Sequence, residues 1–407
     1  MNLIYGQAPD QPLPSCDEAY NIFLGAGNRL GAADTIRLMA DFQAGHGHLQ
    51  QAIATDQRAL AVLQELGEHA KTGLLLNNMA IIFATEGKLD RAEQLYRLAK
   101  ADFEQAGDRA NTKIAVGNIA DILYLRGNLP GAAKLYGQAL EIDATLDHKE
   151  PEYLLYRFGD LELTRGHVQD AHRLVQEAVD ASRSHPGTNA SGSISELGVV
   201  LKAEGDLQSA RRQYQSALDL SQKMGDMDAM EESQVALVDL ALEEGHADQA
   251  EPLLRAAISQ FEKEKVDPDT TSAYTVLSRA LLMQGNLEES RKAIQHAAEL
   301  GHHSPDPALT LPIAIQTARI EVATAGRDEA GHFAIAAAGQ QLRSTIATAQ
   351  KLGYFGIECE ARLALAEVEI KANPSRGRSE LETLEKESHE HGLELLSHKA
   401  ELLASVN

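Results

Sequence analysis

Few residues in this chain have a type and spacing that could do chemistry. Three glycines between Gly25 and Gly31 resemble a phosphate-binding loop, but a dinucleotide fingerprint requires a preceding strand and a βαβ context. Histidines come close together at three places, none with the helical spacing and third ligand that a zinc site requires; these are His46 and His48, His302 and His303, and His389 and His391. We interpret the glycines as a turn and the histidines as solvated residues, most of them in turns.

No serine lies in a nucleophile-elbow pattern, and no pair of carboxylates is marked as an acid and base couple. We interpret the many carboxylates as solvated charge on helix faces. The sequence therefore predicts no catalytic residues, no metal site and no cofactor, and it indicates a protein that is not an enzyme.

Charge narrows the class of partner. The formal net charge of the 407 residues is -23, and such a field repels phosphate backbones and anionic lipid surfaces. We expect no nucleic acid and no membrane as partners, and a partner with basic residues is electrostatically favoured. The charge is equally compatible with a role in solubility alone.

Two cysteines, Cys16 and Cys359, are too few and too far apart for a disulfide framework. The sequence has no basic start followed by an apolar run, and no stretch of eighteen apolar residues. These features indicate a cytoplasmic protein.

The elements that position these residues recur at a nearly fixed period. A glycine followed by a polar residue and then usually Leu marks a turn at Gly47, Gly87, Gly127, Gly166, Gly205, Gly245 and Gly285. The steps between these glycines are 40, 40, 39, 39, 40 and 40 residues. A period of this length predicts an array of stacked repeats.

Small residues recur with the glycines. Twelve positions after each turn glycine lie Ala59, Ala99, Ala139, Ala178, Ala217, Ala257 and Ala297. Five positions after it lie Ala52, Ala92, Ala132, Ala171, Ala210, Ala250 and Ser290. Small side chains are needed where two helix axes cross at about 8–10 Å, and glycine allows the left-handed turn between them. Each unit is thus a helix A, a short turn and a helix B.

This pattern resembles the tetratricopeptide-repeat (TPR) family, in which the small residue of helix A, the turn glycine and the two alanines of helix B are the defining positions. The period resembles the lengthened repeats of kinesin light chains, LGN-type adaptors and Rap-type regulators. The resemblance implies an all-α, right-handed superhelical solenoid of about eight to nine helix pairs with a C-terminal capping helix.

The ends depart from the pattern. We expect an irregular segment over residues 1–15, a regular array over 16–300 that starts in the middle of a repeat, and degenerate units with a capping helix over 301–407. Gly326 should close an eighth unit, and Pro374 should open a helix of the ninth.

The resemblance also implies a binding surface, because helix A of each TPR lines the concave groove. In the family, the residue nine positions before the turn glycine faces this groove and is often Asn; here it is Leu38, Asn78, Asn118, Arg157, Glu196, Ala236 and Val276. The predicted partner-binding groove is Asn77, Asn78, Asn118, Asp121, Tyr124, Tyr153, Tyr156, Arg157 and Asp160. Alternatively, these residues are only solvated, and the groove binds no partner. Arg157 could form an internal ion pair with Asp121 and Asp160, or engage a ligand carboxylate.

Two functions follow from the resemblance. The first is an interaction scaffold that holds a protein or peptide in the concave groove. The second is a sensory or regulatory tail of a larger bacterial signalling protein, similar to TPR tails attached to serine/threonine kinases or winged-helix regulators. The sequence does not specify the partner or the oligomeric state, or whether the groove or the convex face is used.

Overall fold

The computed structural model describes residues 14–184, 189–264 and 267–405, and these residues form twenty helices and no strand. The first members of the helix pairs, the A helices, are α2 (Arg29–Gly45), α4 (His69–Thr85), α6 (Arg109–Leu125), α8 (Glu152–Thr164), α10 (Ala190–Ala203), α12 (Met227–Glu243), α14 (Asp267–Met283), α16 (Pro307–Thr324) and α18 (Phe355–Ala372). The second members, the B helices, are α3 (Leu49–Leu66), α5 (Leu89–Ala106), α7 (Leu129–Asp143), α9 (Val168–Ser184), α11 (Leu207–Met224), α13 (Ala247–Glu264), α15 (Leu287–Gly301), α17 (Glu329–Leu352) and α19 (Pro374–Glu390).

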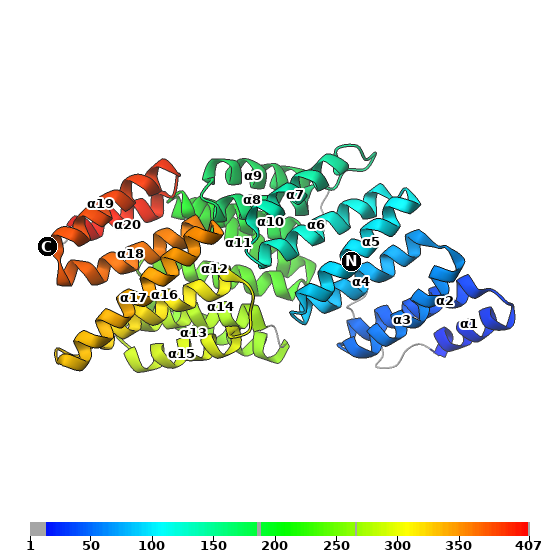
Figure 1. The fold of residues 1–407 in the computed structure, drawn as a ribbon, viewed down its shortest axis with the longest axis horizontal. Coiled ribbons are helices and arrows are strands. Elements are labelled where there is room, and N and C mark those ends of the chain that lie inside the picture. Colours follow the sequence, from blue (N-terminus) through cyan, green and yellow to red (C-terminus); the bar gives the residue numbers. More distant parts are fainter. Residues whose placement is uncertain (1–13, 185–188, 265–266, 406–407) are drawn as a thin grey trace. The chain divides into compact units, whose positions relative to one another are not determined.

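Two further helices, α1 (Pro14–Gly25) and α20 (Glu394–Ser405), flank these nine pairs in the described part of the chain. The predicted repeat solenoid is therefore confirmed, including the helix after the last pair (Figure 1). The irregular segment expected over residues 1–15 falls largely on residues 1–13, which lie outside the described residues.

The predicted turn glycines all adopt the left-handed conformation, with φ between 71° at Gly87 and 86° at Gly245. The long period is extra helical length, since α2 has 17 residues and α3 has 18, joined by only three residues. Helix starts follow local rules as well. Asn373 caps α19 by accepting a hydrogen bond from the Arg376 backbone N–H, and Pro374 occupies the first turn, as the sequence predicts.

Crossings between the two helices of a pair explain the small residues. The alanines and Ser290 at the repeat positions of helix B are all buried. A Cβ atom added to Gly159 would lie 2.3 Å from Val175, and one added to Gly198 would lie 2.6 Å from the Tyr214 ring. In the seventh pair, Ser278 and Ser290 replace two small apolar residues, and each hydroxyl donates to the other's backbone carbonyl, at 2.9 and 2.7 Å.

The chain divides into two compact units. Unit 1 comprises Met1–Tyr124 and Pro130–Lys149, and unit 2 comprises Leu125–Leu129 and Glu150–Asn407. Each unit buries its own apolar clusters, such as Ala33, Ala59 and Leu63 in unit 1. The boundary at residue 300 rests on repeat regularity and remains a proposal.

Unit 2 closes on itself. One apolar cluster joins Val168 and Val175 of α9 and Leu197 of α10 to residues of α18, α19 and α20, among them Leu396 and Ala400. Helix α8 also contacts α18, and α10 contacts α20 (Figure 1). The last helices of unit 2 therefore pack against its first helices.

The closure of unit 2 gives two turn glycines a second role, at close contacts between its first and last helices. A Cβ atom on Gly166 would lie 2.4 Å from the Phe355 ring, and one on Gly392 would lie 3.3 Å from Val168. The His391 ring nitrogen Nδ1 bonds the Gly166 carbonyl at 3.0 Å. Backbone segments more than 200 residues apart thus meet where only glycine leaves room.

Candidate functional site

In unit 1, the predicted groove residues form short hydrogen-bonded sets. Asn118 on α6 donates to the Asn77 side-chain oxygen on α4 at 3.0 Å, and Asn78 donates to Asp41 on α2 at 3.2 Å. Asn78 and Asn118 are half-buried, while Asn77 is 8% exposed. Side-chain amides thus link successive A helices of unit 1.

Two other predicted residues of unit 1 are more enclosed. The Tyr136 hydroxyl of α7 donates to Asp121, so this carboxylate already has a protein partner. Tyr124 is buried, with 7% of its surface exposed.

The predicted residues of unit 2 lie together on α8. Arg157 and Asp160 form an ion pair at 3.1 Å, one helical turn apart, and the rings of Tyr153 and Tyr156 meet edge to face with centroids 5.4 Å apart. All four side chains are half-buried. Of the two alternatives for Arg157, the pairing with Asp160 is observed.

A cavity of about 610 Å³ lies inside unit 2. Its wall is formed by four consecutive A helices, α12, α14, α16 and α18, and by α20. Val276, nine positions before Gly285, is among the lining residues, so this repeat position does face the inside of the unit. The volume is typical of pockets that hold small ligands.

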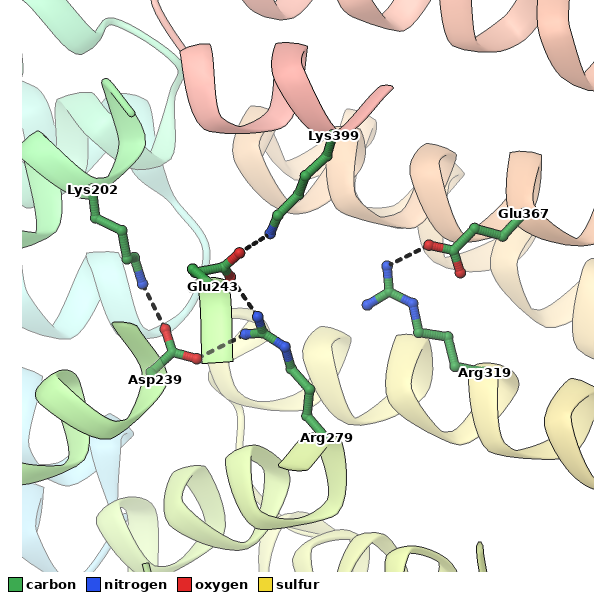
Figure 2. A network of polar contacts seen from close by, with 7 residues as sticks. All are labelled: Lys202, Asp239, Glu243, Arg279, Arg319, Glu367 and Lys399. Carbon is green, nitrogen blue, oxygen red and sulfur yellow. Dashed lines mark hydrogen bonds and ion pairs between the residues drawn. The ribbon is translucent and has the colours of Figure 1, made fainter. Parts of the chain in front are cut away.

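A chain of ion pairs crosses one side of this cavity and joins α10, α12, α14 and α20. Asp239 accepts from Lys202 at 2.7 Å and from Arg279 at 2.8 Å. Glu243 contacts Arg279 and Lys399 (Figure 2). We call this set the ion-pair chain; its members are Lys202, Asp239, Arg279, Glu243 and Lys399.

In the ion-pair chain, the charges of the partners shift the pKa values more than burial does. Burial alone would raise the pKa of Asp239, but the charges of Lys202 and Arg279 outweigh it and hold the pKa below its usual range. Burial likewise would raise the pKa of Glu243, whereas Arg279 and Lys399 lower it. Burial would lower the pKa of Lys202, but Asp239 raises it. All of these groups are therefore charged at neutral pH.

The opposite side of the cavity is less fully paired. Arg319 on α16 donates to Glu367 on α18 at 3.4 Å (Figure 2). Glu360, also on α18, lines the cavity and is exposed. Two large apolar side chains, Met283 and Leu402, line the cavity with 49% and 65% of their surface exposed.

Comparison with family models decides the family. The MalT-like TPR region matches residues 147–405, more than half of the chain, and a tetratricopeptide-repeat model matches residues 71–145. The chain belongs to the MalT-like TPR family. No curated protein matches the sequence.

Solved structures of other TPR-type proteins share the fold. A Rap protein complexed with Competence and Sporulation Factor has a TM-score of 0.54 at 13% identity, covering 83% of this chain and 98% of that one. The apo form of the quorum sensor NprR from B. thuringiensis has a TM-score of 0.54 at 16% identity, covering 70% and 81%. A STAND signal-transduction ATPase with a tetratricopeptide repeat sensor, from Pyrococcus horikoshii, has a TM-score of 0.50 at 14% identity, covering 92% and 55%.

Sequence reasoning missed the ion-pair chain of this TPR protein. It treated the carboxylates as solvated surface charge, which is wrong for Asp239 and Glu243, whose side chains are only 17% and 6% exposed. One feature of the sequence could have indicated these ion pairs. The position six before the turn glycine is acidic in four of the seven units and Arg in a fifth, namely Asp41, Asp121, Asp160, Asp239 and Arg279.

Among the described residues, no group of three or more His, Cys, Asp and Glu side chains is arranged to hold a metal ion. None of the helices in the described ranges combines the length and apolar character that crossing a bilayer requires.

Proposed function

We propose that this protein is a non-catalytic binding module that holds a peptide segment of a partner on its A-helix face, and that the cavity of unit 2 is the main site. The cavity carries the proposal. Four A helices and α20 line a cavity of about 610 Å³ with both charged and apolar side chains, which is the character of a ligand pocket.

The predicted groove residues remain part of this proposal as a second contact surface. Asn78 and Asn118 each have an amide that both donates and accepts, and both lie half-buried on consecutive A helices of unit 1. A peptide backbone that loses water needs such partners. Tyr153, Tyr156 and the Arg157–Asp160 pair would play the corresponding role on α8.

Two of the structurally similar proteins support a peptide ligand. One is a Rap protein whose structure contains Competence and Sporulation Factor, and another is the quorum sensor NprR. Their likeness establishes the fold, and the transfer of peptide binding to this chain is our proposal. A partner with basic residues is favoured by the net charge of -23, and we propose neither nucleic acid nor membrane as a partner. We further propose that the protein acts in the cytoplasm.

A regulatory role is the second candidate. The protein from Pyrococcus horikoshii combines its tetratricopeptide repeat sensor with a signal-transduction ATPase, and a cavity such as that of unit 2 could hold the ligand of a sensor. An effector module encoded in frame with this chain would favour this role.

The binding test uses the full-length protein and an array of immobilised peptides. Val276→Trp should fill the cavity and abolish capture of the peptides that the wild type holds, whereas Leu253→Trp should not, because Leu253 is 58% exposed on α13. Circular dichroism should show unchanged helical content in both variants. Equal capture by both variants would remove the cavity from the proposal.

The groove is tested separately with a captured peptide. The double change Asn78→Ala and Asn118→Ala should weaken binding by about 1–3 kcal/mol in a calorimetric titration, because two buried peptide groups lose their partners. Unaltered affinity would assign no binding role to the unit 1 groove.

A further inference from the structure

We propose that the cavity of unit 2 is selective for a positively charged side chain flanked by apolar residues, and that Glu360 on α18 receives this charge. The inference rests on the proposed peptide-binding function and adds the chemistry of the ligand. It depends on which charged groups around the cavity already have partners and which do not.

Most charged groups of the cavity lining already form ion pairs within the protein. Asp239 and Glu243 are held by the cations of the ion-pair chain, and Glu367 accepts from Arg319. The lining contains four carboxylates, those of Asp239, Glu243, Glu360 and Glu367, against the three cations Arg279, Arg319 and Lys399. Lys202, which pairs with Asp239 from outside the lining, brings the cations to four.

Glu360 is the remaining carboxylate of the lining. Within the described ranges it forms no ion pair, and its side chain is exposed. The negative charge of Glu360 acts weakly on Arg279. Burial lowers the pKa of Arg279, Asp239 and Glu243 raise it, and Glu360 raises it by a smaller amount. The guanidinium nitrogens of Arg279 are bonded to Asp239 and Glu243. A ligand ammonium or guanidinium can bind Glu360 without breaking any ion pair.

An anionic ligand would fit poorly. It would approach the free carboxylate of Glu360 and could reach Arg319 only beside Glu367, which already accepts from it at 3.4 Å. A neutral carbonyl is the better partner for the remaining N–H groups of Arg319, since it adds no charge. A peptide backbone supplies such carbonyls next to its side chains.

The apolar lining specifies what flanks the charge. Met283 of α14 and Leu402 of α20 line the cavity yet remain largely exposed, and Leu363, Leu396 and Leu403 extend the apolar surface inward. Covering exposed apolar surface removes it from water and stabilises a complex. A basic residue between two leucines satisfies both the carboxylate and the apolar side chains.

The test measures calorimetric affinities of three capped peptides for the full-length protein: acetyl-Leu-Lys-Leu-amide and the versions with Gln or Glu in the middle. Because Glu360 is exposed, we expect the Lys peptide to bind about two- to fivefold more tightly than the Gln peptide, and the Glu peptide to bind most weakly. Glu360→Gln should remove the preference for Lys over Gln. Glu382→Gln, an exposed change on α19, should keep it.

The outcomes separate this inference from the proposed function. If the wild type binds the Lys and Gln peptides equally, or Glu360→Gln keeps the preference, charge selectivity by Glu360 is wrong. If in that case Val276→Trp still abolishes binding, the cavity remains a peptide site and the proposed function stands. If the wild type binds none of the three peptides at millimolar concentration, both are overturned. Circular dichroism of each variant shows that the fold is retained.

Discussion

The smallest side chains of the repeat are among its most completely buried. Ala132 and Ala139 on α7 have no exposed surface, and Tyr136 between them is also fully buried. The alanines allow close approach of the paired helices, and the tyrosine fills the space beside them. At such positions the volume of the side chain, more than its polarity, decides what is tolerated.

Replacing Ala139 with Leu should therefore lower the free energy of unfolding by about 1–3 kcal/mol, because the added atoms overpack the crossing. The same replacement at Lys134, which is exposed on the same helix, should change it by less than about 0.5 kcal/mol. Urea unfolding followed by circular dichroism measures both. Equal midpoints would show that the faces of α7 are assigned incorrectly.

Asp56 on α3 is a buried carboxylate with an oxygen that has no hydrogen-bond partner among the described residues. Burial and the nearby Asp41 raise its pKa to about 7 from 3.8, although Arg37 acts against this shift. Since the folded protein favours the protonated form, the contribution of Asp56 to stability is most favourable below pH 3.8. It declines as pH rises and is lost above about pH 7.

Asp56→Asn should consequently stabilise the protein at pH 8 by roughly 2–4 kcal/mol, and the gain should shrink toward pH 4. Unfolding free energies at a series of pH values measure this difference. Asp147→Asn, in an exposed loop of unit 1, serves as the control. A gain that does not change with pH would contradict the assignment to the buried charge.

Among the elements, α20 has two roles in unit 2. Its apolar side chains Leu396 and Ala400 belong to the cluster that joins the last helices to α9 and α10. Its Lys399 reaches the Glu243 carboxylate of α12, and its side chains complete the cavity wall. Docking of α20 and the shape of the cavity are thus linked.

Lys399→Met should loosen α20 and increase the rate of amide hydrogen exchange in this helix by about 5- to 30-fold, equivalent to roughly 1–2 kcal/mol. Lys386→Met should not, because Lys386 pairs with Glu390 at 3.8 Å on the exposed side of α19.

The pKa of Glu243 is lowered in the fold, so its pairing contributes stability above pH 4.5. This contribution is lost as pH falls through the lower, folded-state pKa of Glu243. The difference in the stability of α20 between wild type and Lys399→Met should therefore become smaller in acid.

The elements themselves were predictable because their causes are local and repeated. A left-handed glycine and two buried small residues, alanine at every position except Ser290, recur in seven units, so seven copies reinforce one interpretation. Pro374 and Asn373 marked a helix start for the same kind of reason. The degenerate pair formed by α16 and α17 also has a short connection, between Thr324 and Glu329, which contains Gly326 as predicted, but Gly326 is not among the glycines in the left-handed conformation.

The site was less predictable because it depends on contacts between distant units. Asp239 and Lys399 are 160 positions apart in sequence, and they belong to one network only because unit 2 closes. Small rotations between neighbouring units accumulate along a solenoid, and the sequence pattern does not specify their sum. The Asn77–Asn118 bond also depends on how α4 and α6 stack.

For the molecule as a whole, the net charge of -23 acts over distances much longer than any single contact. It should speed the encounter with a cationic ligand at low salt, since the field attracts the ligand before docking.

The association rate constant of acetyl-Leu-Lys-Leu-amide should therefore fall by about tenfold or less between 20 and 500 mM NaCl, with a smaller change in the dissociation rate constant. Stopped-flow measurements with a fluorescent version of the peptide determine both constants. The Gln peptide is the control and should show little salt dependence of association. An association rate that rises with salt would contradict a steering role for the net charge.

The closure of unit 2 also bears on how this unit folds and unfolds. In an open repeat array each unit contacts only its neighbours, so the array can fray from either end one unit at a time. In unit 2 the last helices contact the first, as the Gly166–His391 bond shows, so fraying at the C-terminus also breaks contacts on α9 and α10. Unit 2 should therefore unfold more cooperatively than an open array of equal length. It should also fold more slowly, because its final contacts close a loop of more than 200 residues.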